Sequence, residues 1–333
     1  EYASAVRMAF QNQRYDPRLS IETRDMTGST DSSGGFLIPT EYASAILDTS
    51  LESEIVRPRA TVWPMKTRER KVPAISSTSH AAGALFGGVS FAWTAEGATI
   101  SSSDAKLESI NLRAHKFAAL TKATDELIED GLSDGELIER IFLAALPFEL
   151  DSAFLHGDGA GKPQGIFQSD ALVTVAAEAG QAANSIQFEN CLSMMSRIHP
   201  RAFQNSVWVA TQTSIRDLMS LSLPLGTAGE RIPILKETDG GEFNLLTRPL
   251  IFSEKLKEIG TKGDILLADF SAYAIGMVAD ARMDMSPFVD FEADKIAFRF
   301  KSRLDGQPVE SQPLTPREGS TTTSSFVTLA ERS

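Results

Sequence analysis

The chain is poor in cysteine and contains no long apolar run. Its 333 residues include one cysteine, Cys191, so no disulfide can form within a single copy. No apolar stretch approaches the ~18 residues that a membrane span requires, and we expect no membrane partner. The 32 lysines and arginines are outnumbered by 44 aspartates and glutamates, which gives a net charge of −12. A chain this acidic is a poor candidate for free-standing nucleic-acid binding, which needs a concentrated basic surface.

Catalytic and ligand-binding patterns are also scarce. The four histidines (His80, His115, His156 and His199) are far apart in the sequence and form no metal-ligand motif. The glycine-rich stretch 157–163 differs from a phosphate-binding loop, because His156 replaces its first glycine and Pro163 its hydroxyl residue. Cys191 lies in a predicted core-facing helical region, which favours an inert thiol. We therefore predict no cofactor, no metal site and no catalytic residue, with an unidentified α+β enzyme as an alternative.

The segment 74–103 is unusual in its lack of charge. It contains no lysine or arginine and a single acid, Glu96. Large apolar residues alternate over Val89–Thr94, as in a half-covered strand, and glycines mark turns, so we expect a long β-hairpin. A two-stranded hairpin is at best marginally stable alone in water. Its aromatic side chains Phe86, Phe91 and Trp93 must be covered either by their own domain or by a neighbouring copy of the chain.

Charge is distributed unevenly along the rest of the chain. Residues 57–71 are basic, with Glu69 as the one acid among them. The basic strip comprises Arg57, Arg59, Lys66, Arg68 and Arg70, followed by Lys71. Residues 104–158 carry twelve acids and five bases. The two strips are either solvated faces, or complementary surfaces that meet across a subunit boundary and determine its register.

The longest predicted helix covers residues 133–156. It begins with the capping-box pattern of Ser133 and Glu136, and its apolar residues recur every three or four positions. Pro147 lies inside the helix, lacks the amide hydrogen that would bond the carbonyl of Leu143, and predicts a bend near 143–147.

Further along, the pattern alternates between helices and strands. Shorter helices are expected at 2–10, 40–51, 188–198 and 214–221. Strands are expected at 207–210, 245–252, 264–269, 273–278, 296–303 and 326–329. We expect loops at 224–244 and 311–324, and a hairpin turn at Asp305-Gly306.

Five motifs, taken in order, give the chain a resemblance to a known family. They are Gly34–Pro39, Trp93–Ala98 followed by Ile110–Asp130, Phe154–Gly159 with Lys162–Ile166, Leu266–Tyr273, and Arg303–Gly306. In this order they resemble the major capsid proteins of tailed bacteriophages with the Hong Kong 97-like fold. Each motif alone is weak, and the resemblance rests on their succession over about residues 34–330.

The resemblance implies an α+β fold with a defined domain order. Residues 1–38 would be an N-terminal arm, and 62–110 an extended β-hairpin loop that reaches over an adjacent subunit. The ranges 39–61, 111–164 and 291–333 would form the peripheral domain, whose spine helix is the one at 133–156. Residues 165–290 would form the axial domain.

The resemblance also implies a function and partners. The chain would self-assemble as pentamers and hexamers into an icosahedral shell that encloses double-stranded DNA without sequence-specific binding. It would be assembled in the host cytoplasm and reside in the virion. Further partners would be a portal, a decoration protein, and a scaffolding segment removed by a maturation protease, with which a start at Glu1 is compatible. An encapsulin-type nanocompartment shell is the alternative within the same fold, and a virion decoration or adhesion protein is a further alternative.

The chain differs from some members of that family at a residue that those members use for covalent crosslinking. Some members form an isopeptide crosslink through a lysine on the extended loop, but this chain has no lysine between Lys71 and Lys106. We therefore predict no such crosslink.

Overall fold

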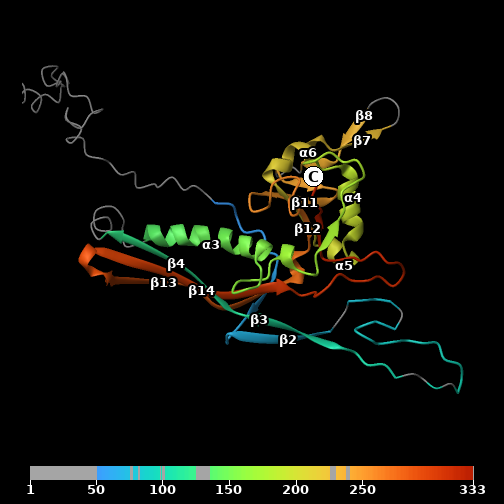
Figure 1. Ribbon diagram of the computed structural model, residues 1–333, viewed down its shortest axis with the longest axis horizontal. Helices are drawn as coiled ribbons and strands as arrows, with labels where there is room; N and C mark the ends of the chain where they lie inside the picture. The colour runs from blue at the N-terminus through green and yellow to red at the C-terminus, as the bar shows by residue number, and fades with distance from the viewer. Residues whose placement is uncertain are drawn as a thin grey trace, which may run out of the picture. The chain divides into compact units, whose positions relative to one another are not determined.

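The computed structural model describes residues 51–75, 78–81, 83–97, 99, 102–124, 136–225, 230–237 and 241–332 (Figure 1). These residues belong to one compact unit that spans Ser50–Ser333. The predicted helix at 2–10, all but the last residue of the one at 40–51 and most of the capping box at 133–136 lie outside the described residues.

A four-stranded sheet forms the first layer of the fold. Within the described residues its strand order is β1-β13-β14-β4. The strands are β1 (Thr61–Pro64), β13 (Tyr273–Asp290), β14 (Lys295–Pro308) and β4 (His115–Thr124). β14 pairs antiparallel with β13 on one side and with β4 on the other, while β1 pairs parallel with the start of β13. β14 alternates buried and exposed residues over 298–304, because one face of the sheet is covered and the other is not.

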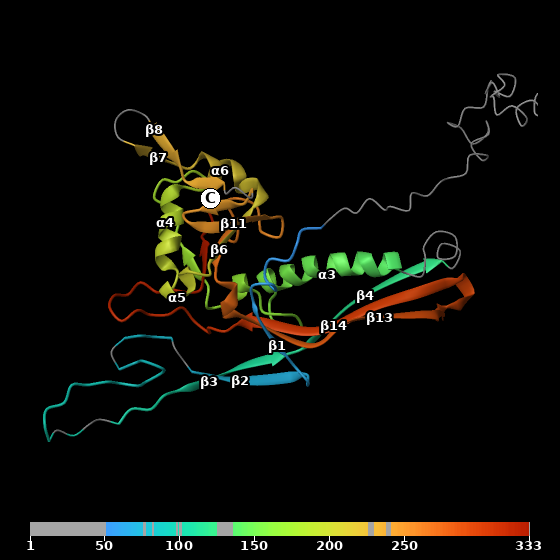
Figure 2. The same cartoon turned by 180° about the vertical axis from the view of Figure 1, so that it is seen from behind.

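The long helix α3 (Glu136–His156) covers one face of this sheet. Near its start, Ile138 belongs to a buried cluster with Ala123 of β4 and Phe298 of β14, and the rings of Phe142 and Phe300 lie 5.8 Å apart. Both views show α3 running alongside β4 and β14 (Figures 1 and 2). The predicted helix is confirmed over 136–156. It continues through Pro147 without a break in helical structure, and the bend at 143–147 stays a prediction.

A seven-stranded sheet forms the second part of the fold. Its order within the described residues is β5-β15-β12-β6-β11-β10-β9. The strands are β5 (Val173–Val175), β15 (Phe326–Leu329), β12 (Ile265–Ala268), β6 (Val207–Thr211), β11 (Arg248–Ser253), β10 (Phe243–Leu245) and β9 (Leu235–Glu237). The three adjacent strands β15, β12 and β6 are buried at every position, which explains their largely apolar sequences.

Three helices accompany this sheet: α4 (Phe188–Arg197), α5 (Pro200–Phe203) and α6 (Ile215–Ser220). Met194 of α4 and Leu218 of α6 are fully buried in a cluster with Trp208 of β6. A second buried cluster joins the two sheets, since it contains Phe154 of α3, Tyr273 of β13 and Phe326 of β15. The predicted helices at 188–198 and 214–221 are confirmed to within one residue at every end.

The predicted loop at 224–244 is wrong. Within the described part of this range, β7 (Ser222–Leu225) pairs with β8 (Glu230–Pro233), and β9 pairs with β10. Pro224 and Pro233 lie inside these short strands, so proline in this region does not mark a loop. The strand predicted at 245–252 is also divided, because Leu246 and Thr247 both adopt positive φ angles in the turn from β10 to β11.

The predicted turn at Asp305-Gly306 is wrong as well, because β14 continues through both residues to Pro308. Close packing explains the glycine, since a Cβ on Gly306 would lie 2.7 Å from the hydroxyl oxygen of Tyr273. The Asp305 carboxylate accepts hydrogen bonds from the backbone amides of Arg113 at 2.6 Å and Gly306 at 2.8 Å. Asp305 and Gly306 therefore lie inside a strand, where they make close contacts with β3 and with Tyr273.

Strand pairing joins segments that are far apart in the chain. β13, which lies within 165–290, pairs along most of its length with β14, and β15, which lies within 291–333, pairs with β5 and β12. The expected domain ranges stay a prediction.

Candidate assembly surfaces

A two-stranded ribbon extends beyond the four-stranded sheet and carries the uncharged segment. It consists of β2 (Glu69–Ile75) and β3 (Leu107–Arg113), which pair antiparallel. Between them, the described part of residues 78–106 contains an isolated bridge between Leu85 and Val89, and the amide of Lys106 donates to the carbonyl of Phe86 at 3.2 Å. The predicted strand over Val89–Thr94 is wrong within a single copy. We attribute this to the absence of a neighbouring strand along that stretch.

The three aromatic side chains predicted to need cover are exposed. Phe86 is 52% exposed, Phe91 85% and Trp93 106%. Ile75 and Leu107, which are paired at the end of the ribbon where the loop begins, are 55% and 72% exposed. The structure therefore does not show the alternative, in which the chain's own body covers these aromatic side chains. The ribbon and loop form an exposed apolar surface, which is a hallmark of an interaction site.

The loop is nevertheless held at its base. The amide of Thr315 donates to the carbonyl of Thr78 at 3.0 Å, and the amide of His80 donates to the carbonyl of Thr315 at 2.8 Å. A bridge between Leu314 and Thr323 closes the segment that carries Thr315. The extended segment 311–324 thus receives the base of the loop, while the residues beyond it reach away from these contacts.

The basic strip divides into two groups. Arg57 pairs with Glu54 at 2.9 Å, and Arg59 donates to the carbonyl of Ile55 at 3.0 Å, so both stabilise the turn that follows the first described residues. Arg70 donates to the carbonyl of Pro64 at 2.7 Å. Lys66 and Arg68 are exposed in the turn between β1 and β2. The two groups lie before and after β1, with three of the five side chains bonded within the chain.

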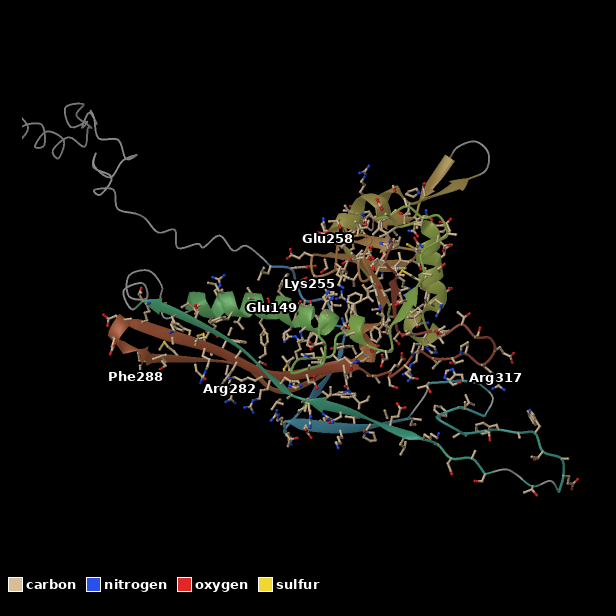
Figure 3. The ribbon with its side chains drawn as sticks, in the orientation of Figure 1. Glu149, Lys255, Glu258, Arg282, Phe288 and Arg317 are labelled. Atoms are coloured by element: carbon tan, nitrogen blue, oxygen red, sulfur yellow. The ribbon has the colours of Figure 1, made fainter. Side chains whose placement is uncertain are left out.

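A buried ion pair, not anticipated from the sequence, anchors residues 53–56. Asp151 of α3 is fully buried, and its carboxylate accepts the amides of Ile55 at 2.6 Å and Val56 at 3.1 Å. It also accepts a hydrogen bond from Lys255 Nζ at 2.9 Å, and Lys255 donates to the carbonyl of Ser53 at 3.0 Å. Lys255 is labelled in Figure 3. About one hundred residues separate these partners along the chain, so no local pattern could reveal the pairing.

Cys191 is buried in α4, and burial raises the pKa of its thiol to about 12. The thiolate, which is the reactive form, is therefore almost absent at neutral pH. We expect a thiol-reactive dye to label the folded protein at least tenfold more slowly than the urea-unfolded chain. Rapid stoichiometric labelling of the folded protein would contradict the buried position.

Little in the described residues supports a metal site, a catalytic histidine or a membrane-spanning helix. Among them, no group of three or more histidine, cysteine or acidic side chains could hold a metal ion. His156 stacks on Phe167 and bonds the carbonyl of Lys255 at 2.8 Å, which is a packing role. No helix in the described part of the chain has the length and apolar character needed to cross a bilayer.

These features are those of a structural protein that exposes an apolar ribbon and loop. The model of the phage capsid family matches residues 34–318, and the chain belongs to that family. The predicted relationship to Hong Kong 97-like capsid proteins is thereby confirmed. The protein is a component of a virion capsid that self-assembles into a shell, and it is not an enzyme.

Solved structures show the same fold at low sequence identity. The capsid of a native GTA particle has a TM-score of 0.69 and 17% identity, covering 92% of this chain and 99% of that chain. The capsid of an empty GTA particle has a TM-score of 0.65 and 18% identity over the same shares. A structure from Microbacterium phage Oxtober96 has a TM-score of 0.62 and 14% identity, again covering 92% and 99%. No curated protein sequence matches the chain.

Proposed function

We propose that this chain is the major capsid protein of a tailed phage, and that pentamers and hexamers of it form an icosahedral shell around double-stranded DNA. The exposed apolar ribbon and loop carry this proposal. A lone copy leaves Phe91 and Trp93 in water, and a shell supplies identical neighbours that cover them. Portal, decoration protein, scaffolding segment and maturation protease are further proposed partners, by analogy with the family.

In this proposal the four-stranded sheet and α3 are the peripheral domain, and α3 is the spine helix. The seven-stranded sheet with α4, α5 and α6 is the axial domain, and the ribbon with residues 78–106 is the extended loop. Residues 1–38 are the N-terminal arm. The fold supports this division because each sheet has its own buried cluster, while a third cluster joins them.

The basic strip is proposed to act at the base of the loop, where it meets the acidic stretch 104–158 of a neighbour. Lys66 and Arg68 are the best placed for this role, because both are exposed. Complementary charge of this kind determines register more than affinity. Exchanging both residues for glutamate tests the contact by its effect on particle uniformity.

Electron microscopy of the expressed protein tests the function directly. We expect closed shells of uniform size, and nuclease-protected double-stranded DNA in particles made with the packaging machinery. A protein that stays monomeric at every concentration would contradict the proposal. Shells filled with a cargo enzyme instead of DNA would identify an encapsulin-type compartment.

Mature shells should carry no covalent links between subunits. The loop lacks the lysine nucleophile on which such crosslinks depend, because none lies between Lys71 and Lys106. Denaturing electrophoresis of boiled particles should therefore give a single band near 36.1 kDa for this chain. A ladder of covalent oligomers that survives reducing agent would overturn this expectation.

A further inference from the structure

Two histidines meet where the base of the loop contacts the rest of the chain. The rings of His80 and His199 are arranged edge to face, with their centroids 6.1 Å apart, and both residues are half-buried. His80 lies at the start of the loop, and His199 directly precedes α5. We call the contact of residues 78–80 with Thr315 and His199 the loop seat.

Backbone hydrogen bonds align the two sides of the loop seat. The amide of Thr315 donates to the carbonyl of Thr78, and the amide of His80 donates to the carbonyl of Thr315. On the other side, the amide of His199 donates to the carbonyl of Ser324 at 2.9 Å. The segment 311–324 therefore lies between α5 and the start of the loop (Figure 1).

The geometry of His199 requires a neutral ring. Its Nδ1 accepts a hydrogen bond from the amide of Arg201 at 3.3 Å. A protonated imidazole carries a hydrogen on both nitrogens and has no acceptor, so this bond exists only in the neutral form. Burial lowers the pKa of His199; the negative charge of Glu310 raises it, and the positive charges of His80 and Arg201 lower it further. The folded structure thus favours the uncharged ring.

The surroundings of the two rings are balanced in charge while both rings are neutral. The charged residues on the elements packed around the pair are Arg197, Arg201, Arg317, Asp269, Glu310 and Glu318. Glu310 already accepts hydrogen bonds from the amide and hydroxyl of Ser325, and Asp269 accepts one from the amide of Ser271. Protonation of both histidines would therefore add two positive charges to three cations and three acids.

Water has access to the loop seat through an adjoining cavity. The cavity has a volume of about 170 Å³, and His199, Arg201, Asp269 and Glu310 are among its lining residues. A polar cavity of this size has room for several water molecules. A proton can therefore reach the ring of His199 without unfolding of the subunit.

We propose that the loop seat is an acid-sensitive latch, which holds the base of the loop while His80 and His199 are neutral and releases it when they are protonated. Protonation removes the acceptor for the Arg201 amide and places two like charges on rings 6.1 Å apart. Its purpose rests on the proposed function, because a released loop can take a new direction toward a neighbouring copy, whereas a seated loop keeps one direction.

The direction of the pH effect follows from His199. A histidine in water has a pKa of about 6.5, and burial lowers the pKa of His199 in the seated state. Release of the loop therefore takes up a proton, and the released state gains as the pH falls below about 6.5. One pH unit below that value, a single histidine shifts the equilibrium toward release by up to about tenfold.

Hydrogen–deuterium exchange on unassembled subunits measures the latch. The amides of His80 and Thr315 donate the bonds of the seat, so their protection reports how often it opens. After correction for the intrinsic pH dependence of exchange, we expect this protection to fall by about tenfold between about pH 7.5 and about pH 5.5. The buried strand Val207–Thr211 is the internal reference and should keep its protection. Light scattering confirms that no particles are present.

A variant without titratable rings separates charge from packing. His199→Asn retains a side-chain oxygen that can accept the Arg201 amide, and His80→Gln retains a polar side chain, but neither takes up a proton in this pH range. The double variant should show the same protection at both pH values. His115→Gln, which removes a histidine outside the seat, is the control and should keep the pH dependence of the wild type. Circular dichroism checks folding in each case.

Three results would overturn the latch. They are equal protection of the wild type at both pH values, an undiminished loss of protection in the double variant at the lower pH, and a folded double variant that is unprotected even at the higher pH. Failure of the wild type to form shells would remove the proposed function instead, and the exchange measured on single subunits would still decide whether the seat responds to acid.

Discussion

Replacing Phe91 and Trp93 with serine will leave the subunit folded and abolish shell formation at concentrations where the wild type assembles. Both rings lie in water in the isolated chain, so their removal costs the subunit nothing in its own core. Covering each ring at a subunit contact contributes about 1.5–3 kcal/mol. Together they contribute about 3–6 kcal/mol per contact, and every 1.4 kcal/mol is about a tenfold change in concentration. The effect is multiplied over the many contacts of a shell.

The measurement combines light scattering with thermal unfolding of the same samples. A control variant on the same loop, Ala92→Ser with Thr94→Ser, changes the residues that alternate with the large rings and should assemble normally. An unchanged melting temperature with lost scattering supports the account. Normal assembly by the Phe91→Ser/Trp93→Ser variant would show that the rings are not part of the contact.

Asp151→Ala will destabilise the subunit by about 3–5 kcal/mol, because it removes the close partner of the buried Lys255 ammonium and leaves Glu52, 4.0 Å away, as the nearest acid. The change also removes the acceptor for the amides of Ile55 and Val56. Urea unfolding should be measured in the Phe91→Ser/Trp93→Ser background, so that assembly does not contribute to the result. Asp158→Ala, which removes an exposed partner of Lys162, is the control and should leave the urea midpoint unchanged.

The double variant Asp151→Ala/Lys255→Met separates the ion pair from the rest of the site. Removing both charges eliminates the unpaired buried ammonium, so part of the lost stability should return. A cost below about 1 kcal/mol for Asp151→Ala alone would show that the segment 53–56 is held by packing instead.

Local patterns predicted the longer helices and several buried strands, because each depends on neighbours in sequence, but they predicted neither β4 nor the second half of β13. The helix at Glu136–His156 and the buried strands at Val207–Thr211 and Phe326–Leu329 have the apolar spacing of their structures. The errors at 224–244 and at Asp305-Gly306 have one cause. Glycine and proline mark close approaches and short connections as well as loops, and only the tertiary fold distinguishes them.

Of the candidate surface and its supporting contacts, the sequence revealed the uncharged aromatic segment but not the buried ion pair. The lack of charge around Phe86, Phe91 and Trp93 was visible in the sequence, and the structure adds that one copy leaves these rings exposed. The Asp151–Lys255 pair was not visible in the sequence. Its two members come from segments far apart in the chain, and only the tertiary fold brings them together.

The most direct test of the central claim is a cryo-electron microscopy map of the assembled protein at side-chain resolution. We expect the rings of Phe91 and Trp93 to lie against an adjacent subunit and to be shielded from water there. Rings that face solvent in the shell, or that pack on the body of their own chain, would contradict it.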